Sequence, residues 1–328
     1  MMNKTKNNDI QLFRALAIIA VVCIHTCPLG LPQVFFRPFM NFAVALFVFL
    51  SGYLTRIEND NWPQFCKKRI IRVIIPYIIW ITVYSLYDHI FKMGSISLLP
   101  RYLLTASVRA HLYYIPVYIS LVLITPFMGK LIKSKYRHIV WLITPISYIL
   151  FFYTKFTPQI QINPSIIKIS GLLFFGWFSY YYLGILLGNN IIRIKWNQTA
   201  LIALLFISFF LQMAEAYALY QLFDFTNCGT QGKLTPLLTN MIFLLLVYTY
   251  LSSKKKRIQY SFLYKIGDYS FGIYLCHVLF INISECSSFY SRIPYPITSL
   301  LILLLSLGFC YCCDKLFHSR ITKYLGIK

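Results

Sequence analysis

Acidic residues are rare in this chain: Asp and Glu together number 9 among 328 residues, against 31 Lys and Arg. Charged residues of both signs make up 12% of the sequence, whereas soluble globular domains contain about 25%. Hydrophobic residues account for 58%. This composition argues against an ordinary cytosolic enzyme.

Patterns typical of disulfide scaffolds and metal sites are also lacking. The nine cysteines show no framework spacing, and most lie in apolar stretches, where a thiol acts as a small hydrophobic group. No His, Cys or acidic spacing indicates a metal site. The first apolar run lacks a small-residue cleavage site, so we interpret it as a retained helix and not as a signal peptide. We therefore expect neither a disulfide framework nor a bound metal.

Apolar residues occur in blocks that are long enough to cross a hydrocarbon core of about 30 Å as helices. A transmembrane barrel would show alternating segments of about ten residues instead. The sequence predicts an all-α fold, a polytopic transmembrane helical bundle that forms a single domain over residues 1–328. The ten expected spans are 10–29, 38–55, 71–91, 111–129, 138–155, 168–188, 199–220, 235–252, 267–286 and 296–317.

The basic residues are distributed unequally between the two ends of these spans. If the N-terminus is cytoplasmic, 23 of the 31 Lys and Arg fall on the inner side. The outer side then holds the other eight, which are Arg37, Lys92, Arg101, Arg109, Lys155, Lys168, Lys233 and Arg292. By the positive-inside rule, both termini should be cytoplasmic. The net charge of +22 therefore reflects the orientation of the spans in the membrane and does not indicate nucleic-acid binding.

Two ionisable residues, Arg14 and His25, lie within the first expected span. Eleven residues at about 100° each bring them to the same helix face, with a rise of about 16 Å. The alternative is that Arg14 extends to the inner headgroups and His25 bonds a neighbouring carbonyl. A shared face favours a polar cavity instead, in which a histidine can act as a general base.

A cluster of three cations, Lys68, Arg69 and Arg72, lies at the cytoplasmic start of the third expected span. Their i,i+3 and i,i+4 spacing places them together on a helix. Such a cluster can bind phosphates. An anchor for anionic lipid is the alternative.

Two further histidines, His111 and His277, are expected from the midplane to the outer half of other helices that could pack beside His25. Tyr114 lies one helical turn after His111. Each histidine could also be a satisfied polar group in the core. Three acidic residues near the outer ends of spans are not paired with any histidine by the sequence; they are Asp88, Glu215 and Glu285.

Taken in order, these motifs resemble the integral-membrane acyltransferase 3 family. The chain shares with it Arg14 and His25 separated by ten residues, then ALFVFLSGYLT and KRIIRVIIPY, and later AHLYYIPVYISLVLITP, YYYLGILLG and GDYSFGIYLCHVLFI. It departs from members that carry a Glu in the fourth-span motif, and from members with an appended extracytoplasmic domain.

The resemblance implies a membrane O-acyltransferase. Such an enzyme moves an acyl group, commonly acetyl, from cytosolic acyl-CoA to a hydroxyl of a surface polysaccharide or a lipid-linked glycan. It implies catalytic roles for Arg14 and His25, and donor binding by Arg69 and Arg72, to which we add Lys68. His111, Tyr114 and His277 match motif positions, and we expect them to bind substrate or to stabilise the oxyanion.

The expected partners are acyl-CoA (acetyl-CoA), the glycan acceptor and membrane lipid, in a bacterial inner or plasma membrane. His25 would act as a general base or carry the acyl group transiently. The sequence leaves a homo-oligomer open. An alternative function is a transporter or flippase for a glycan or an acyl intermediate, in which the same His and Arg would line a pathway.

Overall fold

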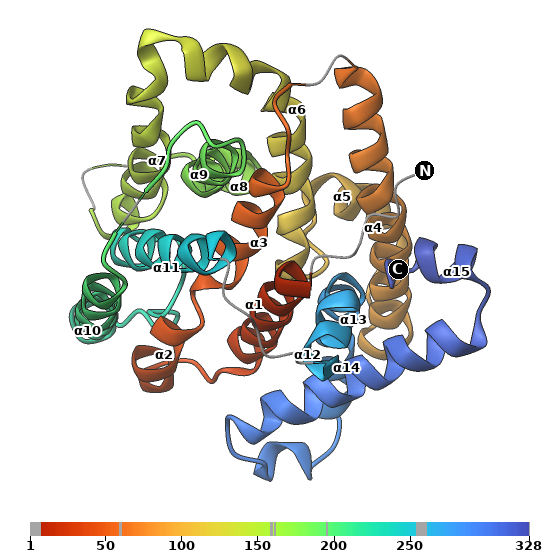
Figure 1. The fold of residues 1–328 in the computed structure, drawn as a ribbon. Helices are drawn as coiled ribbons and strands as arrows, with labels where there is room; N and C mark the ends of the chain where they lie inside the picture. The colour runs from red at the N-terminus through yellow and green to blue at the C-terminus, as the bar shows by residue number, and fades with distance from the viewer. Residues whose placement is uncertain are drawn as a thin grey trace.

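The computed structural model describes residues 8–58, 61–157, 160, 162–194, 196–253 and 261–327, and every regular element in these ranges is a helix (Figure 1). This confirms the all-α prediction. Several residues of the predicted inner-side set lie outside the described ranges, namely Lys4, Lys6, Lys195, Lys254, Lys255, Lys256, Arg257 and Lys328.

Eight described helical segments are long and apolar enough to span a membrane. They are α1 (Asn8–Thr26), α2 with η1 and α3 (Leu31–Tyr53), α4 (Trp62–Lys92), η3 with α6 (Ala110–Lys133), the segment of α7 (Lys135–Phe156), α10 (Gln198–Phe223), α11 (Leu234–Ser252) and α14 (Ile297–Leu316). Within them, α2 is Leu31–Phe36, η1 is Arg37–Phe39, α3 is Phe42–Tyr53, η3 is Ala110–Tyr113, α6 is Tyr114–Lys133 and α7 is Ile143–Phe151.

Two further spans are bent. Helix α8 (Pro164–Gly171) meets the Phe174–Gly188 segment, which contains α9 (Phe178–Gly188), at 48°, and α12 (Ser261–Asp268) meets α13 (Ser270–Glu285) at 74°. Counting each bent pair as one span gives ten, in the predicted order. Two shorter helices, α5 (Leu99–Thr105) and α15 (Ser319–Tyr324), complete the set.

Helix α4 begins earlier than predicted. Asn61 caps it by accepting a hydrogen bond from the Gln64 backbone N–H at 3.0 Å, and Pro63 lies in the first turn, where a missing N–H costs little. The helix therefore starts at Trp62, and Lys68, Arg69 and Arg72 are helical residues.

Small residues allow close packing around the site. A Cβ on Gly184 of α9 would lie 2.3 Å from the Phe49 carbonyl oxygen of α3, and one on Gly267 of α12 would lie 2.0 Å from the Gln11 carbonyl oxygen of α1. Only glycine permits these approaches. The contact at Gly267 places α12 across the start of α1, and the chain bends before α13.

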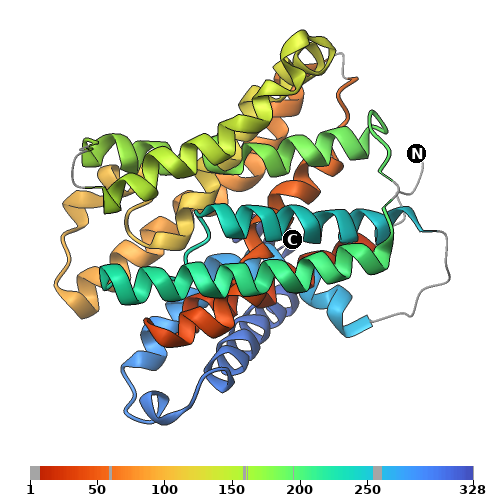
Figure 2. The same cartoon turned by 90° about the vertical axis from the view of Figure 1, so that its left-hand side faces the viewer.

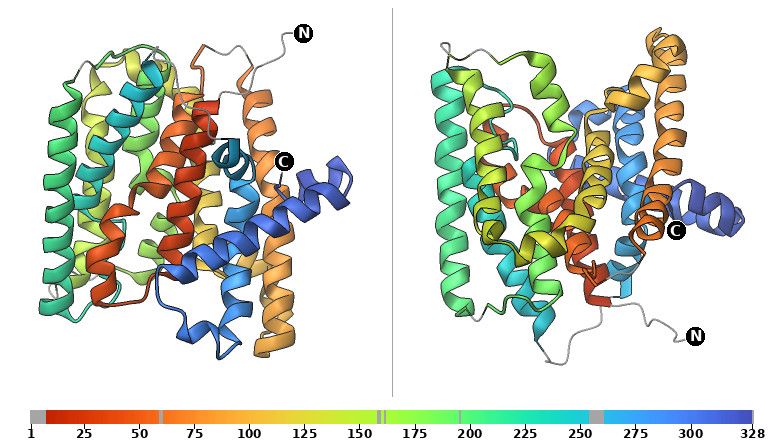
Figure 3. Two further views of the ribbon diagram at one scale, coloured as in Figure 1. Left: turned by 60° about the horizontal axis from the view of Figure 1, so that its bottom comes forward. Right: turned by 90° about the horizontal axis from the view of Figure 1, so that it is seen from above.

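Helix α1 lies in the interior and packs against α3, α12, α13 and α14 (Figure 3). One buried apolar cluster joins α1 to α4, α13 and α14, and a second joins α3 to α9 and α11. Tyr114 packs against both clusters. The first span and the start of α6 therefore meet where the two halves of the core join.

Candidate functional site

Three histidines from different helices meet in the core. The ring centroid of His25, in the last turn of α1, lies 5.1 Å from that of His277 in α13 and 5.9 Å from that of His111 in η3. The rings of His111 and His277 are 4.9 Å apart. The structure thus brings together the three histidines that the sequence placed on separate spans.

Hydrogen bonds fix the elements that carry this cluster. The Tyr84 hydroxyl of α4 donates to the Leu275 carbonyl at 2.7 Å and accepts from the Leu279 backbone N–H at 3.1 Å. The Tyr274 hydroxyl donates to the carbonyl oxygen of His111. Helix α13 is therefore tied to both α4 and η3, which fixes the backbone that carries His277 and His111.

The ring of His277 has a defined tautomer. Its Nδ1 lies 2.8 Å from the Tyr274 carbonyl oxygen and 3.1 Å from that of Ile273, and a carbonyl only accepts, so Nδ1 carries the proton. Its Nε2 is buried without a hydrogen-bond partner among the described residues. Neither ring nitrogen of buried His111 reaches hydrogen-bond geometry with a described group, the Leu275 carbonyl included. Two basic nitrogens are thus left available inside the cluster.

His25 differs from the other two histidines because its side chain is exposed, whereas His111 is 2% and His277 0% exposed. His25 lines a cavity of about 730 Å³ together with His111, Tyr114 and Tyr274. This volume falls in the range of small-molecule sites, about 300–1,000 Å³. The imidazole of His25 is therefore accessible to a ligand although it lies within the bundle.

The cavity is built by the ends of helices and their connections at one end of the bundle. Its lining residues fall in the ranges 21–44, 105–114, 147–155, 167–177, 227–232 and Tyr274. In Figure 2 the connections between α4 and α6 and between α10 and α11 both lie on the left. This is the end that the charge distribution predicts to be outside.

Arg14 faces different surroundings from His25. It is half-buried, does not line the cavity formed by the described residues, and interacts electrostatically with Arg72, Tyr114 and Asp268. His25, near the end of α1, thus faces the cavity, and Arg14, nearer its start, faces a basic region.

The predicted donor cluster lies on the first turns of α4. The guanidinium of Arg69 is half-buried, lies 4.5 Å from the Phe65 ring centroid and donates to Ser51 Oγ at 3.4 Å. Lys68 and Arg72 are exposed. Because Arg14 interacts electrostatically with Arg72, basic side chains of α1 and α4 lie at the same end of the bundle.

Tyr114 lies between the two regions. It lines the cavity, its ring centroid is 5.8 Å from that of Tyr274, and it interacts electrostatically with Arg14. Tyr114 therefore belongs both to the cavity wall and to the surroundings of Arg14.

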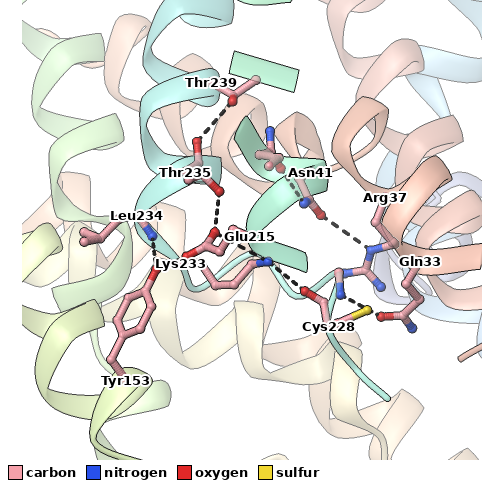
Figure 4. Close-up of polar contacts among 12 residues, drawn as sticks. Gln33, Arg37, Asn41, Tyr153, Glu215, Cys228, Lys233, Leu234, Thr235 and Thr239 are labelled. Atoms are coloured by element: carbon pink, nitrogen blue, oxygen red, sulfur yellow. Dashed lines mark hydrogen bonds and ion pairs between the residues drawn. The ribbon is translucent and has the colours of Figure 1, made fainter. Parts of the chain in front are cut away.

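Two of the three acidic residues that the sequence places near the outer ends of spans, Asp88 and Glu215, are paired with cations. Asp88 accepts from both terminal nitrogens of Arg109, at 2.6 and 2.7 Å, in a bidentate ion pair. Glu215 lies 3.5 Å from Lys233 Nζ (Figure 4). No hydrogen bond joins either carboxylate to a described histidine, and the described residues contain no group of three His, Cys, Asp or Glu able to hold a metal ion.

Sequence reasoning missed several residues of the site. Tyr84 and Tyr274 bond the backbone that carries the histidines, and Trp177 and Arg37 line the cavity. The sequence identifies Arg37 only as a charge of the outer side. The position of Tyr274, three residues before His277 on a helix, was an available signal.

Residues 7–315 match the acyltransferase 3 family, described as an acyltransferase domain. The chain belongs to this family. Comparison with curated proteins and with solved structures found no match. Membership, together with the apolar helices, identifies the chain as a multi-pass membrane acyltransferase of the acyltransferase 3 family.

Proposed function

We propose that this acyltransferase transfers an acetyl group from acetyl-CoA to a hydroxyl of an envelope polysaccharide or a lipid-linked glycan, in a bacterial inner membrane. The observation that carries the proposal is the exposure of His25 in a cavity of about 730 Å³, beside His111 and His277. A nucleophilic hydroxyl needs a base within reach, and His25 is the exposed member of the cluster.

The donor binds at the basic end. Lys68, Arg69 and Arg72 hold the phosphates of CoA, because guanidinium and ammonium groups on neighbouring turns can bind several phosphate oxygens at once. Arg14 interacts electrostatically with Arg72, so it lies near the same phosphates and orients the donor. The pantetheine arm then runs along α1, past Tyr114, and presents the thioester to His25.

The acceptor enters from the opposite end, where the cavity is lined by connections of the predicted outer side. This arrangement requires the N-terminus to be cytoplasmic, as the positive-inside rule predicts. The cytosolic donor and the external acceptor then meet at the histidine cluster without either crossing the membrane.

In the reaction, His25 takes the proton of the acceptor hydroxyl while the oxygen attacks the thioester carbonyl. The tetrahedral intermediate collapses with cleavage of the C–S bond, and the imidazolium returns the proton to the thiolate. The products are an O-acetyl ester and CoA-SH. The Tyr114 hydroxyl and the His111 ring, which both line the cavity, would donate hydrogen bonds to the oxyanion. The Nε2 of His277 has no partner among the described residues and would accept a hydrogen bond from the His25 ring during the reaction. In the covalent variant, His25 itself carries the acetyl group between the two substrates.

Broken helices in matching positions of both halves would favour a transporter. The two bent spans of the described chain both lie after residue 163, in the second half. Together with membership in the family, this favours transfer chemistry over transport.

The proposal is tested with the full chain purified in nanodiscs, supplied with radiolabelled acetyl-CoA and extracted envelope glycans. We expect label in the glycan and release of one CoA-SH per acetyl transferred, and mild alkali should release the label as acetate. Label that stays on CoA under all conditions would contradict the proposal and favour transport.

A further inference from the structure

Two buried cations lie beside each other at the cavity end of the bundle, Arg37 of η1 and Lys233 before α11 (Figure 4). They are 7% and 1% exposed. A buried charge is costly unless it is paired. The two residues differ in how this cost is met.

Lys233 is paired with a carboxylate. Its Nζ lies 3.5 Å from Glu215 Oε2 and donates to the Cys228 carbonyl at 2.7 Å. Glu215 also accepts hydrogen bonds from the hydroxyls of Tyr153 and Thr235 (Figure 4). Burial lowers the pKa of Lys233, and Glu215 opposes that effect. This network ties the connection between α10 and α11 to Glu215 of α10 and to Tyr153.

Arg37 has no carboxylate within ion-pair distance among the described residues. Its Nε donates to Asn41 Oδ1 at 3.5 Å and its Nη1 to the Ile24 carbonyl at 3.4 Å. Both distances are at the long end for hydrogen bonds. A guanidinium has five N–H groups, so this one keeps donors for a further acceptor.

Arg37 is held in the cavity wall. A Cβ on Gly229 would lie 2.6 Å from Arg37 Cγ, so the connection containing Gly229 packs directly on this side chain. Gln33 Oε1 accepts from the Gly229 backbone N–H at 3.1 Å. Because the Lys233 network anchors the same connection, the guanidinium has a fixed position.

The cavity that Arg37 lines carries positive charge without compensation. Lys155 and Lys168 also line it, both are exposed, and none of the lining residues is Asp or Glu. The aromatic rings of Tyr113, Tyr148 and Trp177 line the same space. Flat apolar rings beside cations suit an acceptor that combines sugar rings with negative charge.

Arg37 is also close to the reactive histidine. The Ile24 carbonyl to which it donates belongs to the residue before His25, and the guanidinium interacts electrostatically with the His25 ring. An anion bound to Arg37 would therefore place a nearby hydroxyl within reach of that imidazole.

We propose that Arg37 binds an anionic group of the acceptor, a phosphate or a carboxylate on the glycan, and so selects acidic over neutral glycans. The assignment of the ligand as the acceptor rests on the proposed function, in which this cavity holds the acceptor.

The test measures equilibrium binding of three probes to the purified full chain by calorimetry. The probes are glucose 1-phosphate, methyl glucuronide and methyl glucoside, which present a phosphate, a carboxylate and no charge. We expect at least one anionic probe to bind about tenfold more tightly than methyl glucoside, as a charge-assisted bidentate contact allows. The anion that binds more tightly identifies the group.

Three variants make the test specific. Arg37→Gln should remove the preference, and Arg37→Lys, which keeps the charge but cannot make a bidentate contact, should retain only part of it. Arg292→Gln removes the same charge from an exposed residue that does not line the cavity, and it should behave as wild type. Titration with CoA should be unchanged in Arg37→Gln, because the donor binds at the other end.

Equal affinity for all three probes in the wild-type protein would overturn the proposal, as would a preference that persists in Arg37→Gln. A loss of CoA binding in Arg37→Gln would overturn it too, since Arg37 would then belong to the donor site. Binding of the probes does not require acetyl transfer, so the proposed reaction and the proposed role of Arg37 can be rejected independently of each other. Failure of acetyl transfer with a preserved preference contradicts the proposed reaction, and normal transfer without a preference contradicts the role of Arg37.

Discussion

The ring of His25 lies 5.1 Å from the ring of His277, centroid to centroid, and only the first of the two is exposed to the cavity. His277 donates its Nδ1 proton to backbone carbonyls of its own helix, and its Nε2 has no hydrogen-bond partner in the described part of the chain. One imidazole is thus available to a ligand and its neighbour is fixed in orientation. This relationship is the basis for treating His25 as the base and His277 as a positioning residue.

The double variant Arg69→Ala/Arg72→Ala should raise the KM for acetyl-CoA by at least about tenfold, because loss of two charge-assisted contacts costs more than about 1.4 kcal/mol. The kcat should change less. Steady-state kinetics over a range of acetyl-CoA concentrations measure both. Lys130→Ala/Lys133→Ala, which removes two exposed cations at the end of α6, is the control and should leave the KM unchanged. An unchanged KM in the first variant would leave only the role of a lipid anchor.

Tyr114→Phe should lower kcat by about 10- to 100-fold with little change in either KM, since one oxyanion donor contributes roughly that much or more. Tyr118→Phe, one turn further along α6 and outside the cavity lining, should retain wild-type kcat. A wild-type kcat in Tyr114→Phe would remove its hydroxyl from the mechanism.

Part of this site could be predicted from the sequence. The spacing of Arg14 and His25 fixes their shared helix face, because helical geometry is local. The apolar runs predict ten spans for the same reason, since length and hydrophobicity suffice to identify them.

Features that depend on contacts between distant segments could not be predicted. The 74° bend between α12 and α13 accompanies the packing of Gly267 on Gln11, which are far apart in the chain. The exposure of His25 depends on a cavity lined by six separate parts of the chain. The sequence also does not show which outer-side cation lacks a carboxylate partner. The fold places Glu215 beside Lys233, and Arg37 has no ion pair among the described residues.

Gly184→Leu should disrupt the packing of α9 on α3, because even a Cβ would lie 2.3 Å from the Phe49 carbonyl oxygen. We expect a lower yield and a thermal midpoint reduced by several degrees, measured in detergent by size-exclusion chromatography after heating. Gly308→Leu in α14 is the matched change, since no atom lies within 4 Å of a Cβ there. Equal stability of the two variants would contradict the close approach of the helices.

Glu215→Gln should destabilise the protein by about 3 kcal/mol, because it leaves the ammonium of Lys233 buried without a counter-charge. The double variant Glu215→Gln/Lys233→Met removes the charge as well and should recover part of the loss. Thermal midpoints of the two variants and the wild type provide the comparison. A double variant less stable than Glu215→Gln would show that the pair is not the source of the effect.

The most direct test of the account is acetyl transfer by His25→Ala, measured with radiolabelled acetyl-CoA and envelope glycan beside His138→Ala, which changes an exposed histidine outside the cavity. A general base contributes about 10²- to 10⁴-fold, so His25→Ala should lose at least two orders of magnitude in kcat while its thermal midpoint and acetyl-CoA affinity stay near wild type. His138→Ala should transfer normally. Wild-type turnover by His25→Ala would contradict the central role of this imidazole.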